Sequence, residues 1–196
     1  PAVIKNFFED GIITDDYNSA LKAVLDRADI DFSERNIIIA HQFVTGAQRS
    51  ESEEVSVGGV DSISADLFEN FDYTALGHIH KPQALQKDKM IYAGALEPID
   101  QNDVGQHGYV KGELKDGKAA IQWIPFAGRE YIHSSVEVER SDTEGSIRKR
   151  VKRLINEYGN ENIYKITLAG KRDPDIAFEV NHLAEEGCVL EILDET

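Results

Sequence analysis

The sequence predicts an α+β protein that is built from two consecutive domains. Two short apolar runs, residues 36–41 and 71–77, have the length and content of strands inside a sheet. Residues 16–28 place apolar side chains at the three- and four-residue spacing of an amphipathic helix. Asp116-Gly117 lies between two strand-like stretches and indicates a β-hairpin. Both strands and helices are therefore expected.

The first domain is expected to hold one helix, one or two further helical turns, three sheet strands, a short strand in a loop, and the hairpin. The helix at 16–28 begins at acidic residues, which suit the positive end of the helix dipole. The run at 36–41 is continuous, so we predict a strand that is buried on both faces and that ends in His41. Residues 48–61 are polar and contain glycine, so we predict a loop with a short strand at 55–57. The remaining elements are one or two helical turns at 64–70 with Ser64 as the cap, strands at 71–77 and 89–94, and hairpin strands at 109–113 and 119–124.

The second domain follows a change of composition after residues 126–130. Ile132, Val136 and Val138 occupy alternate positions, as in a strand with one buried face. After this strand we predict a helix at about 143–158, a strand at 163–168, a short helix at 176–183 and a last strand at 189–193. The predicted domains are therefore residues 1–129 and 130–196.

Composition excludes several classes of protein. The 196 residues include 21 Lys and Arg against 36 Asp and Glu, which gives a net charge of −15. This charge argues against coating of nucleic acid by bulk attraction, although it permits local basic patches. The single Cys188 cannot form an internal disulfide, and no stretch approaches the ~20 apolar residues of a membrane span. We expect a cytoplasmic protein that does not enter a membrane.

Three histidines lie at or just beyond the ends of strands that are predicted to be central. They are His41, His78 and His80. The carboxyl ends of strands are where α/β proteins usually assemble their sites, and imidazole suits Zn, Mn and Fe. Two metal ions about 3.5–4 Å apart clamp a phosphoryl group in many phosphatases and nucleases. A core histidine that is bonded to the backbone gives the same pattern, so a structural role stays open. The sequence contains no Asp-x-His or Gly-Asn-His-Asp to supply the remaining ligands.

A basic run lies in the predicted helix of the second domain. Arg148 and Lys152 share one face of this helix, and Lys149 and Arg153 share another. The functional interpretation is a helix that contacts DNA phosphates without reading sequence. The alternative is an ordinary solvated helix face. The other histidines, at 107, 133 and 182, are interpreted as structural, and Cys188 as a small buried residue.

Three segments together resemble the SbcD-type DNA-repair exonucleases of the calcineurin-like metallophosphoesterase superfamily. They are Ile38-Ile-Ala-His-Gln-Phe-Val-Thr-Gly-Ala47, Ser50-Glu-Ser-Glu-Glu-Val-Ser-Val-Gly-Gly59 and Phe71-Asp-Tyr-Thr-Ala-Leu-Gly-His-Ile-His-Lys-Pro-Gln83. In this resemblance, Gly77-His-Ile-His80 matches the last metal motif of the superfamily. Residues 92–98 and 105–109 look like the region that follows the motif, and residues 168–175 are similar to the small capping domain, including that of YhaO-like relatives.

The resemblance implies a fold and a set of metal ligands. Residues 1–129 would be the carboxyl-terminal part of the metallophosphoesterase β-sandwich with its flanking helices, and residues 130–196 a small α+β capping domain that binds DNA. His41 and His78 would bind the second metal ion, and His80 the first. The family's other ligands, two Asp, a His and an Asn, and its catalytic histidine are expected upstream of this chain. The chain begins Pro-Ala-Val without Met, so we expect a fragment of a longer protein.

The resemblance also implies an activity. The intact protein would be a two-metal hydrolase, a manganese-dependent exonuclease and endonuclease that cleaves DNA phosphodiester bonds in repair and recombination. Mg, Zn or Fe could replace Mn. Its partners would be DNA and an SbcC-like ATPase, and a homodimer is compatible with the family. The fragment alone is expected to be inactive. Two alternatives stay open, namely another calcineurin-like phosphoesterase and a non-catalytic module that binds DNA or a partner.

Overall fold

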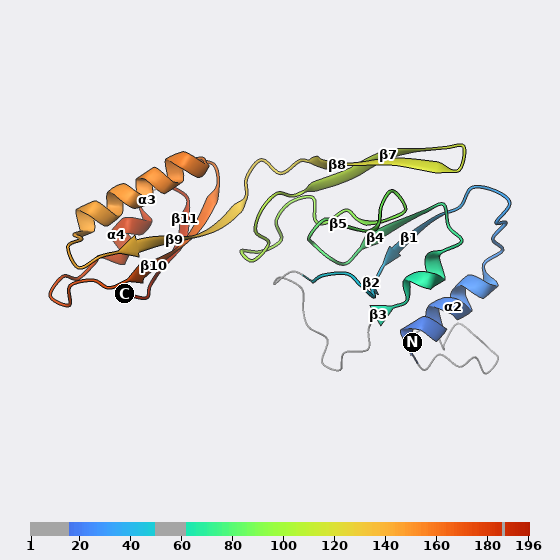
Figure 1. Cartoon of the computed structure of the whole chain (residues 1–196), viewed down its shortest axis with the longest axis horizontal. Coiled ribbons are helices and arrows are strands. Elements are labelled where there is room, and N and C mark those ends of the chain that lie inside the picture. Colours follow the sequence, from blue (N-terminus) through green and yellow to red (C-terminus); the bar gives the residue numbers. More distant parts are fainter. Residues whose placement is uncertain (1–15, 50–61, 186) are drawn as a thin grey trace. The chain divides into compact units, whose positions relative to one another are not determined.

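The computed structural model describes residues 16–49, 62–185 and 187–196 (Figure 1). The short strand predicted at 55–57 lies outside these residues. The chain divides into two compact units. The first comprises Pro1–Ile99 and His107–Phe126, and the second comprises Asp100–Gln106 and Ala127–Thr196. Each unit mixes strands with helical segments, as an α+β protein does.

The first unit is organised around a four-stranded sheet with the order β1-β4-β6-β5. Strands β1 (Ile37–His41), β4 (Tyr73–Gly77) and β6 (Met90–Tyr92) are parallel to one another. All three strands were predicted, β1 and β4 from their apolar runs. Strand β5 (Gln83–Gln86) runs antiparallel to β6 at the edge and was not predicted.

One face of this sheet is buried against a compact apolar core. Helix α2 (Tyr17–Arg27) begins at Asp16, whose carboxylate accepts the Ser19 N–H in a capping box. The 3₁₀ helix η1 (Ala65–Phe68) begins at the predicted cap, Ser64. Both helices were predicted. The buried residues of this core are Val44, Ile63, Phe68, Leu76, Ile79, Met90 and Tyr92.

The prediction that β1 is buried on both faces is wrong. Ile38 and Ala40 pack against the core, whereas 52% of Ile37 and 83% of Ile39 are exposed. The reason is that only the face of Ile38 and Ala40 meets the core, and β1 is also the edge strand of the sheet. No other described strand pairs with its outer edge, and the apolar face of Ile37 and Ile39 is not covered by the part of the chain that the structure describes.

Two further pairs of strands complete the first unit. Strands β2 (Phe43–Val44) and β3 (Ser62–Ile63) form a short parallel pair that was not predicted. The predicted hairpin is confirmed as β7 (Gly108–Lys115) and β8 (Lys118–Pro125). Its turn residues, Asp116 and Gly117, have φ values of 50° and 70°, as a two-residue type I′ turn requires. One side of the hairpin and the strands β5 and β6 line a cavity of about 420 Å³.

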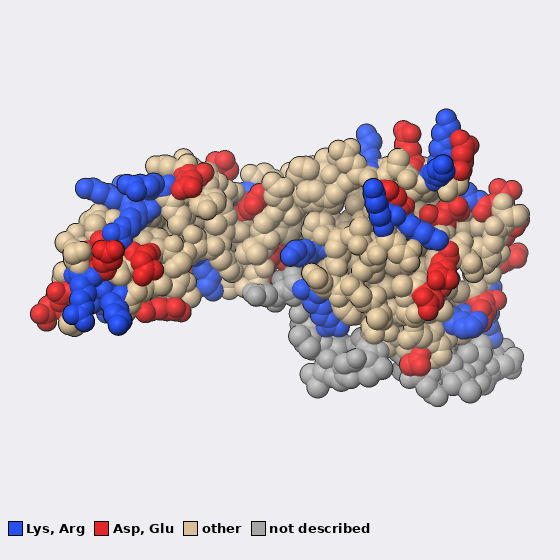
Figure 2. All heavy atoms as spheres, viewed as in Figure 1, with Lys and Arg blue, Asp and Glu red and all other residues tan. Residues whose placement is uncertain are grey.

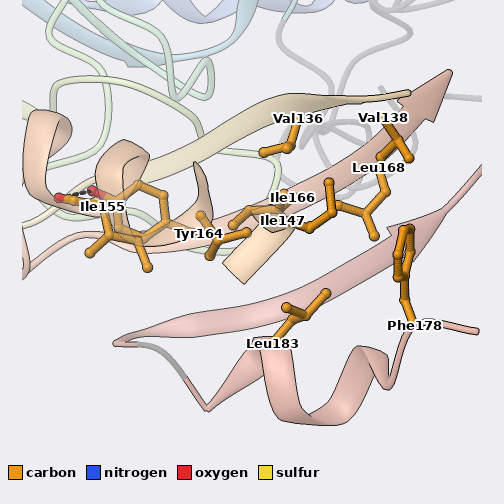
Figure 3. Close-up of a cluster of buried hydrophobic side chains, with 10 residues drawn as sticks. Val136, Val138, Ile147, Ile155, Tyr164, Ile166, Leu168, Phe178 and Leu183 are labelled. Carbon is orange, nitrogen blue, oxygen red and sulfur yellow. Dashed lines mark hydrogen bonds between the residues drawn. The ribbon is translucent and has the colours of Figure 1, made fainter. Parts of the chain in front are cut away.

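The second unit is a three-stranded parallel sheet with helices on one face. Strands β9 (Tyr131–Val138), β10 (Ile163–Gly170) and β11 (Val189–Asp194) have the order β11-β10-β9. Helix α3 (Glu144–Tyr158) and helix α4 (Val180–Ala184) contribute to one buried cluster with the sheet (Figure 3). All five elements were predicted, although α4 starts four residues later than expected. The buried cluster consists of Val136, Val138, Ile147, Val151, Ile155, Tyr164, Ile166, Leu168, Phe178 and Leu183.

The division between the units is not a single cut at residue 129. Residues 100–106 precede the hairpin in sequence but belong to the second unit. The cause is local pairing, since Val104 bridges Tyr131 in parallel and the Gly105 N–H donates to the Tyr131 carbonyl. The His133 ring also lies 2.8 Å from the Gln101 carbonyl oxygen. Such pairing between segments distant in sequence has no signal in composition.

Among the described residues, no helix has both the length and the apolar character needed to cross a membrane.

Candidate metal centre

His41 and His78 lie side by side at the carboxyl ends of two neighbouring strands. Their ring centroids are 5.4 Å apart, and the ring planes are inclined at 76°. The parallel register explains this, because His41 pairs with Gly77 and His78 follows directly. A parallel sheet brings the carboxyl ends of its strands to one edge, and with them these two histidines.

The backbone around this pair is unusual. A Cβ atom at Gly77 would lie 3.0 Å from His41 Nδ1, so glycine makes room for the His41 ring. His78 has a φ of 101°, which L-amino acids other than glycine rarely adopt. Strained conformations of this kind cluster at functional sites, where the surrounding structure holds them. The strain at His78 therefore favours a functional role for the pair.

Tyr92 fixes the chain directly after His41. Its hydroxyl donates to the Gln42 carbonyl at 2.7 Å and accepts the Val44 N–H at 2.8 Å. The side chain is fully buried, and burial raises the pKa of the phenol. The hydroxyl therefore stays protonated and able to donate, which holds His41 at the strand end.

The residues after β6 hold the backbone of His80. The Ala95 N–H donates to the His80 carbonyl at 2.8 Å. Gly94 has a φ of 79°, and a Cβ atom there would lie 2.6 Å from the same carbonyl oxygen. Between the two half-buried histidines, Ile79 points into the core and is 2% exposed. His78 and His80 are thus more accessible than the residue between them.

His41 and His78 are spaced as two ligands of one metal ion would be. Two imidazoles on one tetrahedral ion, with metal–nitrogen bonds of about 2.0–2.1 Å, place their ring centroids about 5 Å apart. The 5.4 Å separation of His41 and His78 agrees with this value. Within residues 16–49, 62–185 and 187–196, however, no three or more His, Cys, Asp or Glu side chains form a group that could hold a metal. The described residues therefore offer part of a ligand set, without a carboxylate.

The predicted DNA-contacting residues all lie on α3. Lys149, Lys152 and Arg153 are exposed and Arg148 is half-buried. Figure 2 shows basic side chains gathered over the part of the second unit that contains α3. Ile147, Val151 and Ile155 form the buried stripe of the helix, so the basic residues occupy its outer surface.

Arg150 differs from the other basic residues of α3 because it is tied into the fold. Its guanidinium donates to both carboxylate oxygens of Asp142, each at 2.8 Å. Asp142 is 5% exposed, and its carboxylate also accepts the Glu139 N–H and the Ser146 hydroxyl. These interactions, with the Glu139 N–H first, lower the pKa of Asp142. Arg150 therefore has a structural role.

The remaining histidines lie outside the pair. His107 is buried, and its Nδ1 lies 3.3 Å from the Ala95 carbonyl oxygen. His133 and His182 are exposed, and His182 lies 3.9 Å from Glu144. Cys188 is exposed, so the expectation that it is buried is wrong. It lies at the turn before β11, where the chain has not yet entered the sheet.

No protein-family model matches the sequence. The resemblance therefore depends on the residues themselves. The support of the histidines by Tyr92, Gly94 and Ala95 was not predicted. The glycine beside a strand end was the available signal, because isolated glycines often mark a close approach of the backbone.

Proposed function

We propose that this chain is part of a two-metal phosphodiesterase of the SbcD type, which hydrolyses DNA. The observation that carries the proposal is the His41–His78 pair at adjacent strand ends, 5.4 Å apart, with a strained backbone at His78. In this proposal the first unit is the carboxyl-terminal part of a calcineurin-like phosphoesterase domain, and the second unit is its capping domain.

The histidines would act as neutral metal ligands. His41 and His78 would hold one ion and His80 the other, with manganese as the proposed metal. When bound, such ions polarise a phosphate and lower the pKa of a coordinated water. The three rings are exposed or half-buried, which allows a phosphate to approach them. Gly77, Tyr92 and Ala95 would keep the rings in place before the metal arrives.

The outer surface of α3 would hold the DNA backbone. Lys149, Lys152 and Arg153 are exposed on this surface, and the Arg150 guanidinium binds Asp142. Contacts of this kind are independent of sequence and weaken as salt rises. An SbcC-like ATPase is the proposed protein partner of the intact enzyme.

The isolated chain should not hydrolyse DNA. Two cations about 4 Å apart need a bridging carboxylate, and neutral imidazoles do not compensate their charge. Since the described residues place no carboxylate in such a group, we expect weak binding of one ion through His41 and His78.

Metal titration tests the proposal. We expect the chain to bind one Zn²⁺ or Mn²⁺ per molecule in calorimetry. The variants H41A and H78A should each lose at least ten-fold in affinity for the metal, because each substitution leaves only one of the two histidine ligands. H133A is the matched control, since His133 is an exposed histidine of the second unit. Equal affinity in all four proteins would contradict the proposal.

A non-catalytic DNA-binding module is the second candidate, favoured by the incomplete ligand set and the basic surface of α3. The two candidates differ in one measurement. Duplex cleavage by the full-length protein with Mn²⁺, lost in its H80A variant, supports the enzyme. DNA binding without cleavage, unchanged by chelator, supports the module.

A further inference from the structure

A short segment between β6 and the hairpin contacts the hairpin on one side and His80 on the other. We call this segment, residues 93–95, the strap. On the His80 side, the Ala95 N–H donates to the His80 carbonyl at 2.8 Å. Gly94 approaches that carbonyl so closely that a Cβ atom would lie 2.6 Å from its oxygen. The backbone of His80 therefore cannot shift without the strap.

Three groups of the hairpin region bind the other side of the strap. Trp123 of β8 donates its indole N–H to the Ala93 carbonyl at 3.1 Å. The Ala95 carbonyl faces both the Gly108 N–H and His107 Nδ1, each at 3.3 Å. The strap is thus held at both ends by groups from residues 107–123.

His107 is itself held firmly. Its side chain is 4% exposed, and its carbonyl accepts the Phe126 N–H at 2.9 Å, which extends the hairpin ladder by one pair. A buried imidazole needs a hydrogen-bond partner, since an unsatisfied polar group in the core is costly. With the proton on Nδ1, the ring donates to the Ala95 carbonyl.

We propose that His107 is a positioning residue for His80, acting through Ala95. The path is short, from the His107 ring to the Ala95 carbonyl and from the Ala95 N–H to the His80 carbonyl. The consequence for metal binding rests on the proposed function. The positioning of His80 by His107 does not depend on that function, because it involves only residues of this chain. Ligands must be held within about 0.5 Å of their productive geometry, so a loosened strap weakens the site without removing a ligand.

Two substitutions separate the hydrogen bond from the volume of the ring. H107N keeps a donor close to the place of Nδ1 but is smaller, whereas H107L keeps the volume and removes the donor. H133L is the matched control, because His133 also approaches a backbone carbonyl, that of Gln101, but lies in the second unit. NMR of the full chain gives two readouts, the exchange rate of the Ala95 amide and the ring signals of His80.

We expect H107L to raise the Ala95 exchange rate by about ten-fold, the effect of losing one hydrogen bond, and to shift the His80 ring signals. H107N should restore both readouts even if its thermal midpoint is lower, and H133L should leave both unchanged. Equal behaviour of H107N and H107L would overturn the proposal, and so would faster exchange throughout the first unit. A Zn²⁺ titration of the same variants separates the two ideas. If no variant binds metal while Ala95 and His80 respond as expected, the proposed function fails and the positioning role stands.

Discussion

The His41 ring lies over Gly77, where a Cβ atom would come within 3.0 Å of His41 Nδ1. This contact joins the ends of two parallel strands and sets the place of the His41 ring beside His78. An alanine at Gly77 must displace either the ring or the strand end.

We therefore expect G77A to weaken Zn²⁺ binding by at least about five-fold, while unfolding is destabilised by only about 1 kcal/mol, because the clash falls on an exposed ring. Calorimetric titration and chemical denaturation measure the two effects. G128A is the control, since a Cβ atom there meets no atom within 4 Å. Unchanged metal affinity in G77A would show that the ring position does not matter.

The backbone at His78 provides a second prediction. Since its φ is 101°, a side chain at this position carries strain that glycine avoids. H78A should therefore be less stable than H78G by about 1 kcal/mol, the reverse of the usual order in regular structure. Urea denaturation of the two variants checks this. Both should lose metal binding equally, so a difference in affinity between them would point to another ligand.

Asp142 makes the second unit sensitive to acid. Its pKa lies below the ordinary value of 3.8, chiefly because the Glu139 N–H donates to the carboxylate. The stabilisation is thus fully present above pH 3.8 and is lost as the pH falls through the lower pKa of the folded state. We expect D142N to cost about 1–2 kcal/mol at neutral pH and to unfold with less dependence on pH below 4. Thermal unfolding by circular dichroism between pH 2 and 7 measures this, and parallel curves for both proteins would contradict it.

Each exposed basic residue of α3 should contribute separately to the affinity for DNA. The double variant K149A/R153A is expected to weaken binding to duplex DNA and to reduce the slope of log affinity against log salt by up to about 2. Fluorescence anisotropy at several salt concentrations measures both. The control K111A/K115A removes two exposed lysines from the hairpin of the first unit. R150A should instead lower stability, because it leaves Asp142 without its guanidinium partner. Equal losses of affinity in the two double variants would indicate nonspecific attraction.

Local patterns predicted most of the elements. The helices capped at Asp16 and Thr143 and the turn at Asp116-Gly117 are determined by residues close together in the sequence. A short stretch of sequence is therefore enough to predict each of them. Strands β5 and β2 were missed because both are short and neither has a clear apolar pattern. Pairing with a neighbouring strand is what makes these residues extended.

The candidate site was only partly predictable. Strand ends and residue types pointed to His41, His78 and His80, and the register brings the first two together. The contributions of Tyr92, Ala95 and His107 come from hydrogen bonds across 12 to 50 residues of sequence, which no local pattern reveals. The exposure of Ile39 was missed for a similar reason, since an apolar run does not show whether both faces of its strand will be covered.

The outer edge of β1 has a consequence for handling the protein. Within the described ranges 16–49, 62–185 and 187–196, no strand pairs with this edge, which lies beside the exposed Ile37 and Ile39. An edge of this kind is a template for strand addition between molecules. Concentrated solutions of the chain should therefore form oligomers rich in intermolecular β-structure, starting from this edge. A lysine in place of Ile39 puts a charge on this strand, which opposes the addition of a second strand. Light scattering should therefore show that I39K stays monodisperse at concentrations where the parent chain does not.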